Sequence, residues 1–220
     1  NCDVAPNGDL LIGDSWNHCI RKVDAKTGVV TTIAGNGRKG FSGDGGLATE
    51  ATFDFVMCIT LSSDKNVIHV ADLNNRRIRA VDLKSGLVNT VAGNGKKGVP
   101  MNGAAAVDSP LVDPRAVVQD SKQNIWILER GGHALRVVRP DGTIHTTAGT
   151  GVRGFADGPA LQAQFGSPKH LCIDNADNIY IADDENGAIR RVDAISGEVT
   201  TILGKGQGDT RVRLSHPHGV

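Results

Sequence analysis

The sequence has no excess of charge of either sign. Its 220 residues carry 24 basic and 24 acidic side chains, so the formal net charge is zero. A chain of this kind gives no electrostatic reason to expect nucleic acid or an anionic membrane as its main ligand. No apolar run approaches the roughly 20 residues that a membrane-spanning helix needs. The first residues, Asn1-Cys2-Asp3-Val4, do not have the form of a signal peptide.

Several signatures of catalysis and metal binding are also missing. No C-x-x-C pair occurs among the four cysteines, which argues against a cysteine zinc site. There is no nucleophile elbow, and no Ser/His/Asp set can be assembled. Gly-rich runs such as 93–98 lack the helix and the Lys-Ser or Lys-Thr ending of a phosphate-binding loop, so we interpret them as turns. Asp44 and Asp157 stand beside glycines and could ligate calcium, but isolated aspartates in turns more often cap backbone amides.

What the sequence does contain is a fourfold repeat. An arginine inside an apolar pattern recurs at intervals of 58, 57 and 54 residues: Arg21, Arg79, Arg136 and Arg190. An acid stands seven residues before each of them: Asp14, Asp72, Glu129 and Asp183. Self-similarity at a long, nearly constant period marks a repeat architecture, in which each unit is one supersecondary element. Function is therefore to be sought in what differs between repeats.

Within one repeat the pattern predicts four short strands. In the fourth repeat they are expected at 169–173, 178–182, 188–193 and 198–202. Turns rich in Asp, Asn and Gly separate them. A Gly-rich connection then leads to the next repeat, with room for a short helix at 48–53 and at 160–165.

Four-stranded antiparallel meanders repeated head to tail are the blades of a β-propeller. We therefore predict an all-β fold, with residues 1–220 forming one propeller segment in which four repeats are visible. A solenoid is the weaker alternative. The repeats are expected at about 1–55, 56–113, 114–167 and 168–220, the last residues beginning a further blade.

The acid and the arginine of each repeat lie at opposite ends of the hairpin between the second and third strands, so they can meet across its turn. We interpret the pair as structural rather than catalytic. A half-buried ion pair is costly to break from one side. Arg136→Ala is therefore expected to destabilise the fold more than a surface substitution.

The first repeat resembles a known family. The run Asn17-His18-Cys19-Ile20-Arg21-Lys22-Val23-Asp24 after Gly13-Asp14-Ser15 resembles the NHL repeat, which is named for an Asn-His-Leu triplet. The second repeat departs from it at Asn75-Arg76, the third keeps the His in Gly132-His133, and the fourth has Asn186-Gly187. The connections 40–46 and 154–160 also resemble those of long NHL repeats, so the resemblance covers the whole chain.

This resemblance implies mostly six-bladed propellers that serve as binding platforms, with some relatives acting as lyases or hydrolases through a channel metal. It favours an extracytoplasmic or secreted location. Pro217-His218-Gly219-Val220 aligns with the start of a first strand, and Asn1-Cys2-Asp3-Val4 aligns with the same strand. Because two copies would compete for one place in a closed four-bladed ring, we expect four consecutive blades of a longer propeller. The remaining blades are then expected partners.

Histidines are the plausible metal ligands. First strands line the channel of a propeller, so the residues to weigh there are Arg115, Lys169, His170, His216 and His218. The resemblance includes peptide-amidating lyases that hold zinc with channel histidines, and catalytic zinc needs about three protein ligands. Arg115, Lys169, Met57 and Cys58 make a poor zinc cage, so no metal or other cofactor is predicted.

The other histidines have simpler explanations. His69 falls in a column filled by Leu11, Trp126 and Tyr180 in the other repeats, which predicts a packed core position. His18 and His133 are interpreted as hairpin-turn residues, and His145 as an exposed residue of an outer strand. Cys2, Cys58 and Cys172 all fall in first strands, where a small buried residue is wanted. Free thiols are therefore favoured over disulfides.

The long connections place basic residues along one rim: Arg38, Lys39, Lys96, Lys97, Arg153 and Lys205. By the resemblance to NHL domains that bind RNA, such a rim could bind nucleic acid. Only Phe41 and Phe155 could stack on bases, which argues against that ligand. We predict a non-catalytic scaffold that binds a protein, peptide or glycan as part of a larger protein. The alternative is a metal-dependent lyase or hydrolase with its site in the channel.

Overall fold

The computed structural model describes all 220 residues, and they form four consecutive antiparallel sheets. The first sheet contains β1 (Cys2–Val4), β2 (Leu10–Asp14), β3 (Cys19–Val23) and β4 (Val30–Ala34). The second contains β5 (Val56–Leu61), β6 (Val67–Asp72), β7 (Arg77–Asp82) and β8 (Val88–Ala92). The third contains β10 (Pro114–Gln119), β11 (Ile125–Glu129), β12 (Ala134–Val138) and β13 (Thr143–Ala148). The fourth contains β15 (His170–Ile173), β16 (Ile179–Asp183), β17 (Ala188–Val192) and β18 (Glu198–Leu203).

Each sheet is a simple meander, because short turns join strands that alternate apolar and polar residues. In the fourth sheet the turn 193–197 is fixed by Asp193, whose carboxylate accepts backbone N–H groups of Ile195 and Ser196. The same Asx turn occurs at Asp24 in the first sheet and at Asp82 in the second. The prediction of an all-β fold built of four-stranded blades is confirmed.

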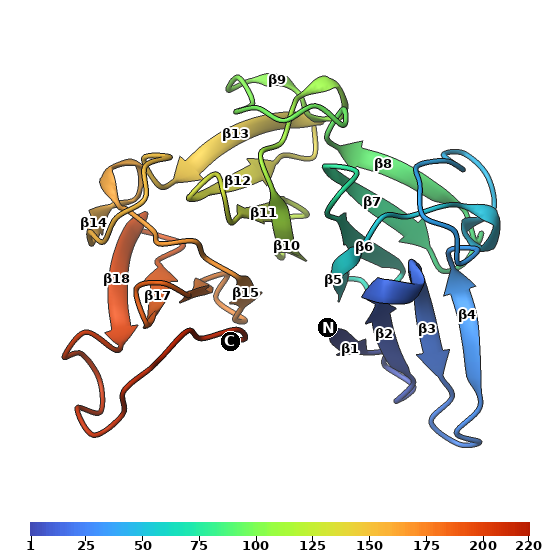
Figure 1. Cartoon of the computed structure of the whole chain (residues 1–220), viewed down its shortest axis with the longest axis horizontal. Helices are drawn as coiled ribbons and strands as arrows, with labels where there is room; N and C mark the ends of the chain where they lie inside the picture. The colour runs from blue at the N-terminus through green and yellow to red at the C-terminus, as the bar shows by residue number, and fades with distance from the viewer.

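The four sheets stand side by side in an arc that is open on one side (Figure 1). The inner strands β1, β5, β10 and β15 lie towards its centre and pack in that order. One core of 13 buried residues joins the first two blades, and another of 22 joins the second, third and fourth. The β-propeller arrangement therefore buries apolar surface mainly between blades.

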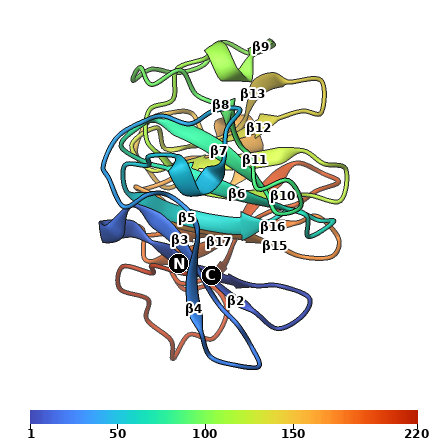
Figure 2. The same ribbon diagram turned by 90° about the vertical axis from the view of Figure 1, so that its right-hand side faces the viewer.

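The long connections and the turns between second and third strands lie on one face, which we call the connection face. In the side view of Figure 2, the 3-10 helix η1 (Ser15–Asn17) marks this face. The hairpins that join β1 to β2 and β3 to β4 project the opposite way. No helix of the structure is long and apolar enough to cross a membrane.

Each connection continues beyond its own blade and wraps over the outer strand of the next one. Short 3-10 helices form within the regions where a helix was expected, at Ala48–Glu50 and Ala160–Gln162, and a third forms at Ala106–Asp108. Two-residue strands, which the sequence did not predict, pair with outer strands: β9 (Ala104–Ala105) with β13 and β14 (Gly158–Pro159) with β18. These pairings cover what would be open sheet edges.

The first blade has no such covering. Val30 of β4 is 59% exposed, whereas its counterparts Val88, Ile144 and Val199 in the other outer strands are fully buried. The strand pairings place all four residues at the same register position. The difference follows from what packs on each strand, since the sequence is apolar at all four places.

Candidate functional site

The repeated arginines lie on third strands, and a bulge sets their direction. In all four blades the pairing between the third and fourth strands shifts immediately before the arginine, for example between Ile189 and Arg190. A β-bulge bends the strand and redirects the following side chain. In the second and fourth blades the arginine thereby contacts the connection that precedes its own blade.

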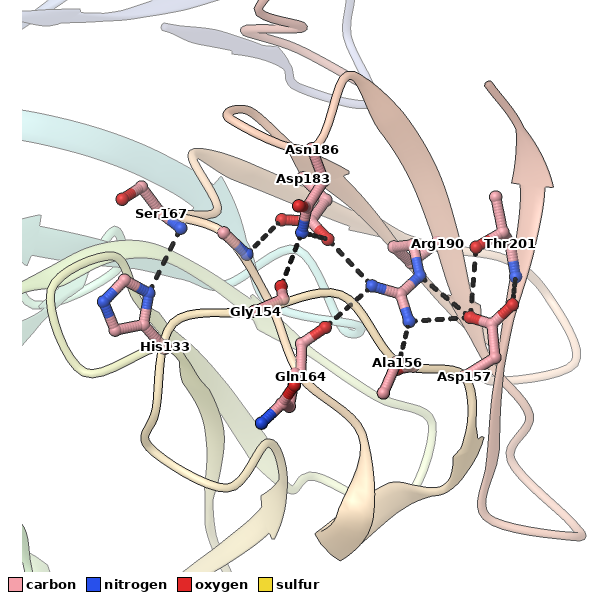
Figure 3. Close-up of polar contacts among 11 residues, drawn as sticks. His133, Gly154, Ala156, Asp157, Gln164, Ser167, Asp183, Asn186, Arg190 and Thr201 are labelled. Atoms are coloured by element: carbon pink, nitrogen blue, oxygen red, sulfur yellow. Dashed lines mark hydrogen bonds and ion pairs between the residues drawn. The ribbon is translucent and has the colours of Figure 1, made fainter. Parts of the chain in front are cut away.

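In the fourth blade Arg190 is completely buried among oxygen atoms of two segments (Figure 3). Its guanidinium donates to Asp183 at 2.8 Å and to Asp157 of the preceding connection at 2.6 Å. It also donates to the backbone carbonyls of Ala156 and Gln164. We call this arrangement an arginine cluster. It ties the connection to the blade that the connection covers.

The second blade repeats this arrangement. Arg79 is fully buried and forms an ion pair with Asp44 at 2.8 Å, while the carboxylate of Asp72 lies 3.6 Å away. Phe41 and Phe53 flank the guanidinium, with ring centres 4.9 and 5.1 Å from its central carbon. The sequence had suggested backbone caps or calcium ligands at Asp44 and Asp157. The structure pairs both with arginines, and Asp157 also accepts the backbone N–H of Thr201 at 3.0 Å. Their shared place in two Gly-Phe connections was the available signal.

In the third blade the residues around the arginine are different. Glu129 replaces aspartate and binds Arg136 at 2.7 Å. The longer acid takes space that an asparagine occupies in the other blades, because a Cβ atom at Gly132 would lie 2.8 Å from the Glu129 carboxylate. Asn102 stands in place of the connection aspartate and accepts the backbone N–H of Thr146 at 2.7 Å.

In the first blade the cluster is incomplete. Arg21 binds Asp14 at 3.3 Å, but its side chain is 36% exposed, compared with 0 to 2% for the other three arginines. No connection packs over it. All four predicted acid–arginine pairs therefore lie within ion-pair distance, and only the first is open to solvent.

In the turn between the second and third strands, an asparagine contacts the preceding connection, whereas a histidine contacts the start of the next blade. The Asn186 amide donates to Asp183 and, at 2.8 Å, to the carbonyl of Gly154 in the preceding connection. His133 instead accepts the backbone N–H of Ser167 in the next blade at 3.2 Å (Figure 3). His18 accepts the N–H of Phe55 in the same way. The turn histidines therefore link consecutive blades, a role that the sequence did not reveal.

All six predicted rim cations are exposed: Arg38, Lys39, Lys96, Lys97, Arg153 and Lys205. Two of them are paired with acids of the following blade. Lys39 lies 3.6 Å from Asp54, and Arg153 lies 2.6 Å from Glu185. Pairing of this kind at an exposed site lowers the local positive charge but adds little stability.

Four of the predicted channel residues lie near the start of the fourth inner strand: Lys169, His170, His216 and His218. The fifth, Arg115, lies in β10 of the third blade. The Lys169 ammonium lies 3.0 Å from Asp184 and 2.7 Å from the Nε2 atom of His218. His216 also contacts Asp184, at 3.1 Å. His170 lies 2.9 Å from the amide of Asn1, so the inner strands of the first and fourth blades approach across the centre. Burial lowers the pKa of His170 below its usual value.

These residues do not fit a zinc site. No group of three His, Cys, Asp or Glu side chains is placed to hold a metal ion. His218 faces an ammonium group, and His170 contacts an amide. All four cysteines are free thiols.

Comparison with known proteins relates both the sequence and the fold to characterised chains. The chain is 28% identical over 250 aligned residues to NHL repeat-containing protein 2 of Bos taurus, covering 96% of this chain and 34% of that protein. It is 27% identical over 216 residues to the chloroplastic protein SUPPRESSOR OF QUENCHING 1 of Arabidopsis thaliana, covering 92% of this chain and 20% of that protein. No family model matches the sequence. The chain is a β-propeller segment that is similar to NHL repeat-containing proteins over most of its length.

Solved structures agree with this fold. Virginiamycin B lyase from Staphylococcus aureus superimposes with a TM-score of 0.59 at 19% identity, over 91% of this chain and 53% of that one. Likeness at this identity concerns the fold alone. The chain spans about a fifth to a third of the length of the two sequence relatives. Its activity therefore has to be argued from its own surface.

Proposed function

We propose that this NHL propeller is a non-catalytic scaffold whose connection face binds a protein, peptide or glycan within a larger protein. The observation that carries the proposal is the arginine cluster. Arg79 and Arg190 hold the connections before their blades by ion pairs and carbonyl contacts. The exposed residues of those connections are thus presented on a fixed surface, which lowers the entropy cost of binding.

The rim cations give this face its chemistry. Arg38, Lys96 and Lys97 are exposed and make no ion pair. The alternative function is a metal-dependent lyase or hydrolase with its site in the channel. No set of metal-ligating side chains among the channel residues favours it. We therefore infer recognition rather than turnover.

A triple variant tests the scaffold. Arg38→Ala, Lys96→Ala and Arg153→Ala together remove one cation from each of three connections. Wild-type protein and the variant would be screened on a defined peptide and glycan array, with circular dichroism melts to compare folding. The proposal expects ligands that bind the wild type and lose at least about tenfold in affinity, which is roughly the effect of one charge-assisted hydrogen bond. If every array ligand binds both proteins equally, the rim is not the binding surface.

We further propose that another blade precedes the first one in the working molecule. Arg21 and Val30 are exposed where their counterparts are covered by the connection of a preceding blade. A blade placed before β1 would supply such a connection, and both relatives extend well beyond the aligned region. Additional blades would complete the ring that the arc in Figure 1 leaves open.

A further inference from the structure

In the third blade two arginines stand at neighbouring positions of adjacent strands, where the fourth blade has an ion pair. Arg115 follows Pro114 at the start of β10, and Arg130 follows the acid that ends β11. Their counterparts by position are Lys169, which follows Pro168, and Asp184, which follows Asp183. In the fourth blade these two bind at 3.0 Å, with Asp184 buried and Lys169 mostly buried. In the third blade the same two positions both carry positive charge.

The two guanidinium groups lack protein partners. The Nε atoms of Arg115 and Arg130 are buried, and neither has a hydrogen-bond acceptor. No carboxylate lies within ion-pair distance of either side chain. A buried, unpaired donor is costly, and more so when it is charged.

Local electrostatics disfavour the positive charge of Arg115. Burial, followed by the charge of Arg130, lowers the pKa of Arg115, while Asp113 and Asp184 oppose this effect. Asp184 is already bound by Lys169 and His216. Asp113 is therefore the one remaining acid beside two arginines.

We propose that Arg115 and Arg130 bind a carboxylate from an acidic segment of a partner protein. This inference rests on the proposed scaffold function and names the chemistry of its partner. A guanidinium pairs with a carboxylate through two parallel hydrogen bonds. The fold itself seats a carboxylate at this place in the fourth blade, where Asp184 binds Lys169.

Neighbouring cations extend the site towards the second blade. Arg76 and Lys97 line a pocket of about 290 Å³ together with Asp113 and Gly131, and Gly131 directly follows Arg130. The Nε atom of Arg76 is also buried without a partner. A segment with several acidic side chains can therefore contact two adjacent blades at once.

The test uses fluorescein-labelled hexaglutamate, with hexaglutamine as the neutral control peptide. Binding is measured by anisotropy titration at about 0.15 M salt, because salt at this concentration screens long-range electrostatic attraction. Arg130→Asp recreates the charge pattern of the fourth blade and fills the site from within. Arg139→Asp makes the same charge change at an exposed position beyond the other end of β12. Arg130→Gln removes the charge while keeping a long polar side chain.

We expect hexaglutamate to bind the wild type and Arg139→Asp alike, and Arg130→Asp at least about tenfold more weakly, as for the loss of a charge-assisted hydrogen bond. Arg130→Gln should weaken binding in the same direction. Equal weakening by Arg130→Asp and Arg139→Asp, or no binding by the wild type, would overturn the proposal. Inorganic phosphate that competes as well as free glutamate would also overturn it, because the site would then be a general anion site.

The result separates this inference from the scaffold proposal. Array ligands that depend on Arg38, Lys96 and Arg153 but bind Arg130→Asp normally would leave the scaffold standing and remove the carboxylate site. Hexaglutamate binding that depends on Arg130, with no array ligand affected by the rim variant, would support the carboxylate site and contradict the rim as the binding surface.

Discussion

At the scale of single residues, Arg190 and Arg21 offer a matched comparison. Both follow a bulge and bind an acid of their own blade, but Arg190 is buried with Asp183 and also binds the partly exposed Asp157, while Arg21 is itself partly exposed. Arg190→Ala leaves two acids without their cation and is expected to cost about 3–5 kcal/mol of unfolding free energy. Arg21→Ala should cost no more than about 1 kcal/mol. Urea unfolding of both variants measures the difference, and equal losses would contradict the buried-cluster account.

His69 provides a second residue-scale prediction, through pH. It is buried, both ring nitrogens lack partners, and burial lowers its pKa to about 4, against a weaker opposing effect of Asp64. Between an unfolded pKa near 6.5 and about 4, the unfolded chain binds a proton that the folded chain does not. Stability is therefore lost as the pH falls through this range.

We expect His69→Leu to be more stable than the wild type, by a margin that grows from pH 7 to pH 4. Asp72 acts in the opposite sense, since burial raises its pKa to about 6 and so favours the folded state below that pH. Both proteins carry Asp72, so its contribution largely cancels in their difference. Chemical unfolding at a series of pH values measures the margin. A margin independent of pH would mean that His69 titrates normally.

At the scale of elements, the outer strand β4 differs from β8, β13 and β18 because no segment forms backbone hydrogen bonds along its outer edge. Its amides are expected to exchange with solvent faster than those of β8, since an open edge strand frays at lower cost. Hydrogen exchange followed by mass spectrometry compares peptides from the two strands. A longer protein that contains the preceding blade should protect β4. Equal exchange in β4 and β8 would show that the covering connection contributes no local stability.

The strands of the blades could be predicted from the sequence. The pairing of the connections with the outer strands could not. In the fourth blade each observed strand agrees with its predicted range to within one residue at either end, because alternation and Asx turns are local signals. β9 and β14 have only two residues each, and they form because an outer strand lies beside them. Their pairing is decided by tertiary placement, on which local propensity has little influence.

At the scale of the whole molecule, the arc explains which parts of the candidate site were predictable. Exposure of the rim cations followed from their place in Gly-rich connections. Pairing of Lys39 with Asp54 and of Arg153 with Glu185 depends on how one blade is set against the next. The like-charged Arg115 and Arg130 became visible only by comparison with Lys169 and Asp184 in space. The sequence repeats therefore predict the fold well. The contacts that differ from blade to blade become visible only in the three-dimensional structure.

Because each connection packs over the following blade, the unit that folds cooperatively does not have the same boundaries as the sequence repeat. A blade is completed by residues that stand before its first strand, so a protein cut at a sequence-repeat boundary always leaves one blade uncovered. Duplication of such a unit adds a blade together with the cover for its successor. In a chain of nearest-neighbour units, unfolding is then expected to begin at the uncovered first blade and to proceed along the arc.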